Sequence, residues 1–432
     1  MRKSFYKYVL QSTAGMLGIS VYILADTLFI SMYAGADGLT VLNLVLPIYG
    51  LIFAIGAMTG IGSATRYALR KARGEADTDV YFLHSLLWCL IMSVPFMLAG
   101  MLAPEQVLRI MGADPAIAEL GKDYLRIILT VTPLFMMNYT FTAFSRNDNA
   151  PAVAMAGSLS GSLFNVVFDY VFMFPMDLGL AGAALATAVS PAVTMSVCSV
   201  HFLGKHNGIG FRWAIPSVRR LFSCWQLGVS AFVGEMASAV TTLIFNVLIL
   251  GIAGNTGVAA YGVIANISLV AMAIFNGITQ GTQPLISRCF GQGKTEEARS
   301  LLRLGLFVSL LAEALILAGT WGATDLLIGI FNRERNEALL YYAHDGMRLY
   351  FLGYLFAGVN IMLVGYFSAV GRAGLAFGAS MLRGVLAIGA CAVLLSRVWG
   401  MNGIWLSFGA SELLTFFLIL IAQRKGPQAE SL

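Results

Sequence analysis

Two long stretches of the chain are almost free of charged residues. Between Lys7 and Arg66 only Asp26 and Asp37 are charged, and from position 221 to 287 only Glu235 is. A membrane-spanning helix needs about 20 predominantly apolar residues, so each stretch is long enough for a pair of transmembrane helices. The sequence therefore predicts an all-α integral membrane protein.

Composition supports this prediction and excludes other classes. Of the 432 residues, 58% are hydrophobic and 11% are charged, whereas a soluble domain carries roughly 25% charged residues. A soluble enzyme, a disordered chain and a low-complexity polymer are therefore excluded. The five cysteines are sparse and odd in number, which excludes a secreted disulfide scaffold.

Turn-rich breaks divide the apolar sequence into twelve predicted spans. They cover residues 11–33, 40–65, 81–103, 119–143, 151–173, 181–203, 225–252, 258–285, 303–323, 346–370, 373–395 and 401–423. Lys and Arg favour the cytoplasmic loops of membrane proteins. With the N-terminus inside, 19 of them fall in inner segments and seven in outer ones: Arg109, Lys122, Arg126, Arg333, Arg335, Arg348 and Arg397. We therefore expect both termini in the cytoplasm of a plasma (inner) membrane protein, with no cleaved signal peptide. The net charge of +5 reflects this bias and indicates no nucleic-acid partner.

The two halves of the chain repeat a glycine pattern. At an offset of 219, Gly35, Gly38, Gly62 and Gly74 match Gly254, Gly257, Gly281 and Gly293. Parallel repeats of a half bundle are typical of secondary transporters, whose substrate path runs between the halves. We expect twelve transmembrane helices in two six-helix pseudo-symmetric lobes, 1–203 and 225–432, joined by a cytoplasmic linker over 204–224.

Several acidic and polar residues of the N-terminal half are expected to meet at one depth of the membrane. They are Asp26, Asp169, Asn165, Thr187 and Tyr124, and Asn165 lies one helical turn before Asp169 on the same face. A buried, unpaired carboxylate is costly, so a proton, a cation or a basic partner is implied. The set predicts a proton site or an oxygen cage for a hard cation such as Na⁺; solvated residues at the membrane interface are the alternative.

Further polar residues lie within the predicted spans. Glu235 is either a proton carrier or a counter-charge for a cationic substrate; the alternative is a structural role, as a partner for Arg383 or in a local hydrogen bond. Asn138 lies mid-helix, where an interhelical hydrogen bond is the alternative to a functional role. For Glu313 and Glu412, structural and functional roles stay open.

One motif resembles a nucleotide site without meeting its requirements. The run Gly291-Gln292-Gly293-Lys294-Thr295 is similar to the end of a phosphate-binding loop, but position 288, where that motif needs glycine, is arginine. No zinc-ligand pair or catalytic triad is found. We therefore expect neither an enzyme, nor a cofactor, nor ATP; transport should draw on an ion gradient.

Two segments carry a family resemblance. Residues 26–30 (Asp-Thr-Leu-Phe-Ile) with Gly35, and Asn165-x-x-x-Asp169 followed by the small-residue run 179–187, resemble signatures of the multidrug and toxic compound extrusion (MATE) family, in the bacterial drug-exporting branch with Asp in the first helix. The resemblance implies two six-helix lobes around a central cleft. It also implies an N-lobe cation or proton site at Asp26, Asp169, Asn165, Thr187 and Tyr124. Glu235 matches an acid used in other branches, whereas Asn360 is the nearest polar position to their second acid.

The resemblance implies a cation-coupled (H⁺ or Na⁺) multidrug antiporter. By alternating access it would export small amphipathic, mostly cationic organic compounds. Membrane lipids would be its other partners. A flippase for a lipid-linked or other amphipathic precursor is the alternative. Such a flippase would show a strongly cationic central cavity, and intramembrane arginine in this sequence is limited to Arg383.

Overall fold

The computed structural model describes residues 2–205, 207–213, 215–331 and 337–425, and in these ranges the regular secondary structure is helical. Arg333 and Arg335 lie outside them. The helices of the N-terminal half are α1 (Arg2–Ala72), η1 (Thr78–Val80), α2 (Tyr81–Leu102), α3 (Pro104–Ile110), α4 (Pro115–Thr130), α5 (Thr132–Asn147), α6 (Pro151–Met173) and α7 (Gly179–Phe202). Those of the C-terminal half are α8 (Val218–Gly291), α9 (Thr295–Gly322), α10 (Thr324–Phe331), α11 (Glu337–Tyr350), η2 (Phe351–Gly353), α12 (Tyr354–Ala369), α13 (Ala373–Met381), η3 (Leu382–Leu386) and α14 (Ala387–Lys425).

The expectation of a multi-span membrane protein is confirmed, with some different boundaries. Within the described ranges, 10 helices are long and apolar enough to cross a membrane, or up to 11 when α4 and α5, which meet at a 44° bend, count as one span. That pair corresponds to the predicted span 119–143. The last two predicted spans fall within one range, Ala373–Gln423, which is interrupted at Gly400. α8 begins at Val218, seven residues before the predicted start at 225.

Glycines break the longest helices at the repeat positions. α1 and α8 each contain one residue with non-helical backbone, Gly35 (φ 56°) and Gly254 (φ 60°), which correspond at the offset of 219. A positive φ is accessible to glycine without the penalty that a Cβ imposes. Gly179 (φ 54°) and Gly400 (φ 56°) form a similar pair at an offset of 221. The backbone therefore turns in the same way at corresponding points of both halves.

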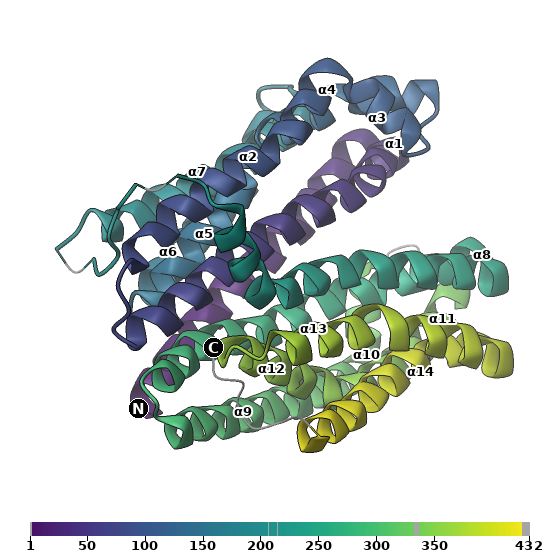
Figure 1. Ribbon diagram of the computed structural model, residues 1–432. Helices are drawn as coiled ribbons and strands as arrows, with labels where there is room; N and C mark the ends of the chain where they lie inside the picture. The colour runs from purple at the N-terminus through teal and green to yellow at the C-terminus, as the bar shows by residue number, and fades with distance from the viewer. Residues whose placement is uncertain (1, 206, 214, 332–336, 426–432) are drawn as a thin grey trace.

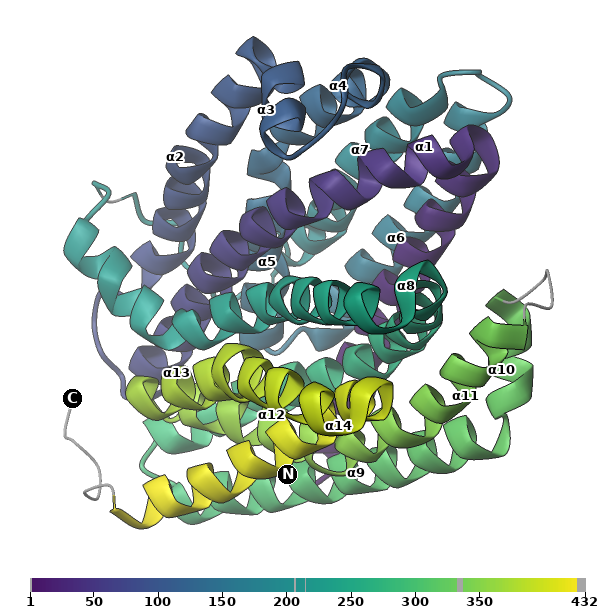
Figure 2. The same cartoon turned by 90° about the vertical axis from the view of Figure 1, so that its right-hand side faces the viewer.

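The helices form two groups that meet along α1 and α8. In Figure 1, α2–α7 and most of α1 lie in the upper part of the view, and most of α8–α14 lie in the lower part; Figure 2 shows the two groups from the side. Within the upper group, Gly157 and Gly161 let α6 approach α7 closely: a Cβ on Gly161 would lie 2.2 Å from Oγ1 of Thr194. Small residues four apart are a common way of packing transmembrane helices without bulky side chains between them.

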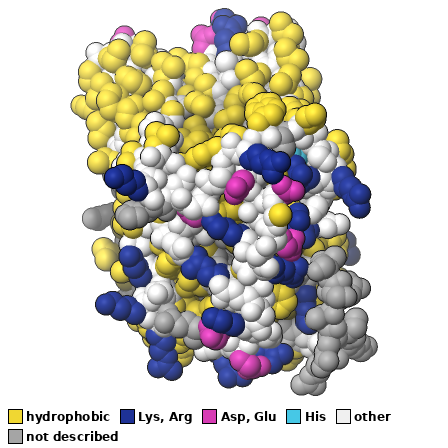
Figure 3. Space-filling view, turned by 60° about the vertical axis from the view of Figure 1, so that its left-hand side comes forward, with side chains coloured by type: hydrophobic (Ala, Val, Ile, Leu, Met, Phe, Trp, Pro, Cys, Tyr) yellow, Lys and Arg dark blue, Asp and Glu magenta, His cyan; other side chains and the backbone are white. Residues whose placement is uncertain are grey.

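Close contacts join the two groups at one end of the molecule. A Cβ on Gly62 of α1 would lie 2.3 Å from the carbonyl oxygen of Cys224 in α8, and a Cβ on Gly281 of α8 would lie 2.7 Å from that of Tyr8 in α1. Arg66 also donates to the carbonyl oxygen of Ser223 at 2.6 Å. This end lies on the left in Figure 1, and Figure 3 shows that Lys and Arg gather on it.

The opposite ends of α1 and α8 are not packed together. Apart from the adjoining backbone, no described atom would lie within 4 Å of a Cβ on Gly35 or on Gly254, and the two helices diverge toward the right in Figure 1. The molecule is therefore closed at its basic end and holds a cavity between the two helix groups.

Candidate functional site

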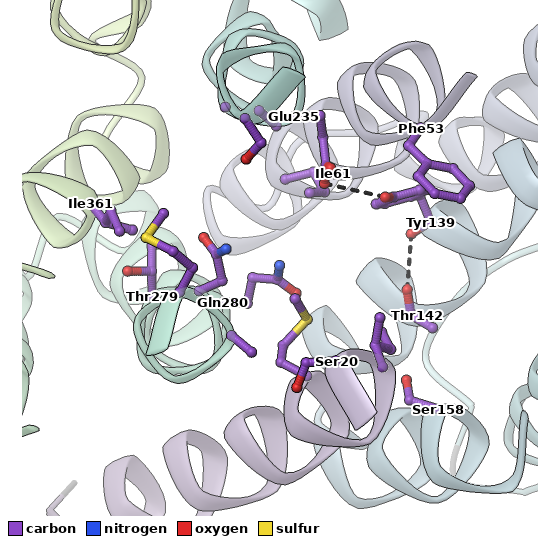
Figure 4. A pocket seen from close by; sticks show the side chains of 18 of the residues that line it. Ser20, Phe53, Ile61, Tyr139, Thr142, Ser158, Glu235, Thr279, Gln280 and Ile361 are labelled. Atoms are coloured by element: carbon purple, nitrogen blue, oxygen red, sulfur yellow. Dashed lines mark hydrogen bonds between the residues drawn. The ribbon is translucent and has the colours of Figure 1, made fainter. Parts of the chain in front are cut away.

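A cavity of about 340 Å³ lies between the two helix groups. Its walls come from α1, α5, α6 and α7 on one side and from α8, α12, α13 and η3 on the other. Figure 4 shows Glu235 of α8 hydrogen-bonded to Tyr139 of α5 in its wall. Polar lining residues include Ser20, Asn138, Tyr139, Thr142, Arg146, Ser158, Ser162, Thr187, Ser190, Thr194, Glu235, Gln280, Gln283 and Arg383. The cavity is thus a mixed apolar and polar site, as small-molecule sites commonly are.

Asp26 and Asp169 form a buried carboxylate pair beside this cavity. Asp26 lies in α1 and is 8% exposed, and Asp169 lies in α6 and is fully buried. The two carboxyl groups lie close enough to interact electrostatically. Among the described residues, no donor contacts Oδ1 of Asp26 or either carboxylate oxygen of Asp169. Two adjacent buried carboxylates cannot both stay ionised without compensation, so the pair calls for a proton or a cation.

Two further predicted residues connect this pair to the cavity. Asn165, one turn before Asp169 in α6, donates from Nδ2 to Oγ1 of Thr187 in α7 at 3.1 Å. Thr187 itself lines the cavity. Oδ1 of Asn165 is buried without a donor among the described groups. The side-chain oxygens of Asn165 and Thr187 are therefore available close to the carboxylates.

Tyrosines complete the surroundings. The hydroxyl of Tyr124 hydrogen-bonds that of Tyr49 at 3.2 Å, so the predicted partner of the acids is itself engaged by a second tyrosine. Sequence reasoning missed Tyr22, which lines the cavity and lies within electrostatic range of Asp26, Asp169 and Glu235. Its position four residues before Asp26 in α1, hence on the same helix face, was the signal that could have found it.

Glu235 and Asn138 both line the cavity. Oε1 of Glu235 accepts a hydrogen bond from the hydroxyl of Tyr139 at 3.2 Å. Pairing of Glu235 with Arg383, one of the alternatives, is not found, because Arg383 contacts a different acid. Oδ1 of Asn138 is buried and has no donor within the part of the chain that the structure describes, so an interhelical hydrogen bond to this atom is not formed.

Asn360 belongs to a separate polar cluster in the C-terminal half. Its Nδ2 donates to Oε2 of Glu412 at 2.7 Å, and the other carboxylate oxygen of Glu412 lies 2.7 Å from Nε of Arg383. Asn360 is fully buried and is not part of the cavity wall, whereas Arg383 is. Glu313 lies nearby in α9 and accepts the backbone N–H of Val359 at 3.0 Å. Glu412 thus has a structural partner, and the cluster reaches the cavity through Arg383.

Arg146 requires a correction. It was counted among the arginines of the inner segments, outside the predicted spans, and Arg383 was expected to be the one intramembrane arginine. The structure places Arg146 in the last turn of α5, where it is 9% exposed and lines the cavity. The cavity therefore contains two arginines and one glutamate.

Comparison with known proteins identifies the family. The sequence model of the MatE family matches residues 12–171 and 231–393, which is most of the chain. The chain belongs to the MATE family. Members of this family are transporters, so this protein is a transporter and not an enzyme.

Relatives and solved structures agree along nearly the whole chain. The transporter is 25% identical over 393 residues to the multidrug export protein MepA of Staphylococcus saprophyticus, covering 90% of this chain and 86% of the relative. It is 23% identical to MepA of Staphylococcus aureus, covering 97% and 93%.

Two solved structures share the fold. One is an outward-facing conformation of a multidrug resistance MATE family transporter, with a TM-score of 0.91, 20% identity and coverage of 98% of this chain and 95% of that one. The other is a transporter of the same superfamily from Pyrococcus furiosus, with a TM-score of 0.89, 19% identity and coverage of 98% and 97%. At these identities the likeness concerns the fold alone.

Proposed function

We propose that this transporter is a cation-coupled antiporter that exports amphipathic, mostly cationic organic compounds in exchange for H⁺ or Na⁺. The observation that carries the proposal is the buried Asp26–Asp169 pair. Asp26 of α1 and Asp169 of α6 interact with each other beside the central cavity. Two relatives of the chain are named multidrug export proteins, which supports drug-like substrates.

Binding of the coupling ion acts by neutralising this pair. With H⁺, one proton is shared between Asp26 and Asp169; with Na⁺, the two carboxylates, Oδ1 of Asn165 and the hydroxyl of Thr187 supply oxygen ligands, with Tyr124 behind them. Neutralisation removes repulsion between α1 and α6 and favours their rearrangement. By linkage, the ion and the drug must favour different conformations for exchange to occur.

Glu235 and Asn138 are the proposed drug-binding residues. A carboxylate that shares the cavity wall with tyrosine and phenylalanine rings suits an organic cation, which gains both charge pairing and ring contact. Asn360 is proposed to act in coupling, since it holds Glu412 against Arg383, which lines the same cavity.

The proposed architecture has twelve transmembrane helices in two pseudo-symmetric lobes, 1–203 and 225–432, joined by the linker 204–224. The matching positive-φ glycines of the two halves support it. The proposed location is the plasma (inner) membrane with both termini cytoplasmic, supported by the basic face in Figure 3. In this orientation the closed end is cytoplasmic and the structure is outward-open.

The test is ethidium efflux from energised proteoliposomes, with a proton gradient and a sodium gradient imposed separately. We expect one gradient to drive efflux in the wild type and in Asp37→Asn, an exposed acid of the same helix. Asp26→Asn should insert normally and lose coupled efflux. Wild-type rates in Asp26→Asn would refute the proposed ion site, and efflux without any gradient would refute antiport.

A flippase for a lipid-linked or other amphipathic precursor is the second candidate. Arg146 and Arg383 in the cavity wall favour it, because such a precursor carries phosphate. Translocation of a fluorescent anionic lipid, measured by dithionite quenching in the same liposomes, tests this candidate. Lipid translocation with no gradient-driven ethidium efflux would replace the antiporter proposal by the flippase.

A further inference from the structure

His84 is a buried histidine whose Nε2 atom is approached by two hydrogen-bond donors. It lies in the first turn of α2 and is 1% exposed. The backbone N–H of Ser217 donates to Nε2 at 3.1 Å, and Nε1 of Trp88 donates to it at 3.2 Å. The carbonyl oxygen of Ser217 lies 3.2 Å from the same atom. Two donors and one acceptor at a single ring nitrogen favour the neutral imidazole with its proton on Nδ1.

The contact with Ser217 completes the beginning of α8. Ser217 is the N-cap residue of α8, and its Oγ accepts the backbone N–H of Arg220 at 3.4 Å. In a capping box, a Glu or Gln at the third helical position accepts the N–H of the cap residue in return. Here that position is Arg220, whose side chain has no acceptor. His84 therefore supplies, from α2, the acceptor that the first turn of α8 does not contain.

The linker and the first turns of α8 are held on the N-terminal helix group. Before Ser217, the linker contacts the acids that precede α2: Nη1 of Arg212 donates to Oδ1 of Asp77 at 2.6 Å, and a Cβ on Gly210 would lie 2.1 Å from Cγ of Asp79. After Ser217, the start of α8 packs on α1 in the close contacts at the basic end. Because the rest of α8 belongs to the other helix group, this segment ties the two groups together.

Protonation of the imidazole would break this arrangement. An imidazolium donates from both nitrogens, so it can keep only the contact with the carbonyl oxygen of Ser217. The N–H groups of Ser217 and Trp88 would lose their acceptor, and buried donors without an acceptor are costly. Among the described residues, no carboxylate lies within 4.0 Å of His84 to offset the new charge, whereas His201 has such a partner in Asp148.

The charged groups around His84 oppose a further positive charge. From α8, the charge of Arg220 acts on the imidazole. The guanidinium of Arg220 lies 5.9 Å from the centre of the Tyr81 ring, and that of Arg70 in α1 lies 5.8 Å from it. Tyr81 precedes His84 by three residues on α2. The group that α5 brings to this part of α2 is the uncharged hydroxyl of Thr140. A proton on His84 therefore meets like charge from two neighbouring helices.

We propose that His84 is a proton-sensitive latch: its neutral imidazole holds the start of α8 on α2, and its protonation releases that segment. The latch goes beyond the proposed function, because it depends on the helix contacts and not on any transported compound or coupling ion. Within the proposed cycle, the basic end opens when the start of α8 moves away from α1 and α2. Protonation of His84 thus favours opening of this end, and the opening responds to the pH of the compartment that the basic end faces.

Spin labels on the two joined segments test the latch. They are placed at Val218→Cys in the first turn of α8 and at Leu98→Cys toward the other end of α2, both exposed positions, in a background without the five native cysteines. Double electron–electron resonance measures their distance in detergent, without substrate or gradient, at about pH 8 and about pH 5. With His84 present, the ratio of docked to released molecules should fall by about tenfold at the lower pH, because two buried donors lose their acceptor.

His84→Gln is the decisive variant, because its amide oxygen is still an acceptor but takes up no proton in this range. It should stay docked at both pH values. His201→Gln removes the histidine that pairs with Asp148 at the same end, and His344→Gln removes one in α11 of the other group. Both of these variants should keep the release at low pH.

Four results would overturn the proposal. One is a distance that does not change with pH when His84 is present, and a second is an equal change in His84→Gln. A third is release of His84→Gln at both pH values, since its acceptor is retained. The fourth is loss of the pH response in His201→Gln while His84→Gln keeps it, which would assign the response to the pair of His201 with Asp148. Because no gradient or substrate is used, failure here leaves the efflux test of the antiporter independent.

Discussion

Replacing Gly62 with alanine adds a methyl group at a tight contact between α1 and α8. Its Cβ would lie 2.3 Å from the carbonyl oxygen of Cys224 and 3.0 Å from the backbone N and Cα of Gly228. Non-bonded heavy atoms prefer separations of about 3.5–4.0 Å, so the two helices must move apart by roughly 1 Å. The obstacles are backbone atoms and not flexible side-chain ends, so no rotamer change relieves the clash.

The cost falls on one conformation. Forcing an extra methyl group into a packed contact costs about 1–3 kcal/mol. In the proposed alternating-access cycle the two helix groups separate at this end, so the contact at Gly62 is lost when the cavity opens there. The substitution therefore shifts the equilibrium away from the conformation described here by about 5- to 150-fold, the factor that corresponds to 1–3 kcal/mol.

Double electron–electron resonance measures this shift directly. Spin labels at Asp37→Cys and Thr256→Cys, at repeat-related positions beside Gly35 and Gly254, report the separation of the two groups at the open end. The background lacks the five native cysteines. Gly62→Ala should increase the population of short distances at this end.

The control for this measurement is Gly262→Ala in α8, where no described atom would lie within 4 Å of the new Cβ. It should leave the distances unchanged. Distance distributions that are the same in Gly62→Ala and in the wild type would refute the reasoning that this contact closes the basic end.

Three further predictions test other parts of the structure. Arg383→Met leaves Glu412 buried without its cation and should destabilise the transporter by about 3–5 kcal/mol. Adding Glu412→Leu should restore most of the thermal stability, measured by size-exclusion chromatography after heating. Absence of this rescue would contradict the pairing of Arg383 with Glu412. Glu235→Gln should weaken the binding of the cationic dye rhodamine 123 to the purified transporter by about tenfold, ~1.4 kcal/mol, as measured by fluorescence anisotropy. Unchanged affinity would exclude Glu235 as the counter-charge. Gly161→Val should lower the apparent melting temperature through overpacking of α6 against α7, whereas Gly319→Val, in open space on α9, should lower it less.

Much of the fold follows from the distribution of charge in the sequence. Lipid tolerates few charged side chains, so the gaps between Lys7 and Arg66 and from 221 to 287 locate α1 and α8. The glycine offset of 219 predicted corresponding backbone turns, which are present at Gly35 and Gly254. Boundaries such as Val218 could not be predicted, because helices extend beyond the membrane and there the hydrophobic signal ends before the helix does.

The polar site was predicted only in part. Helical spacing brings Asn165 and Asp169 to one face, and the contact of Asn165 with Thr187 followed from placing both at one depth. Arg146 was assigned to a loop because it lies close to the turn before Pro151. Side chains of a helix lean toward its N-terminus, so an arginine in the last turn of α5 can direct its guanidinium back into the cavity. Counting Lys and Arg residues along the sequence gives no information about the direction in which such a side chain points.

The repeat conserves the backbone scaffold more than the chemistry that it carries. At the offset of 219, Asp26 corresponds to Phe245, and at 221 Asp169 corresponds to Ala390. Phe245 is fully buried and packs on Tyr261 with ring centroids 5.2 Å apart. At these positions the N-terminal half holds two carboxylates, whereas the C-terminal half holds a close-packed phenylalanine and an exposed alanine. Since neither of these apolar side chains carries a charge that a bound ion could neutralise, the coupled rearrangement is expected to begin in α1 and α6.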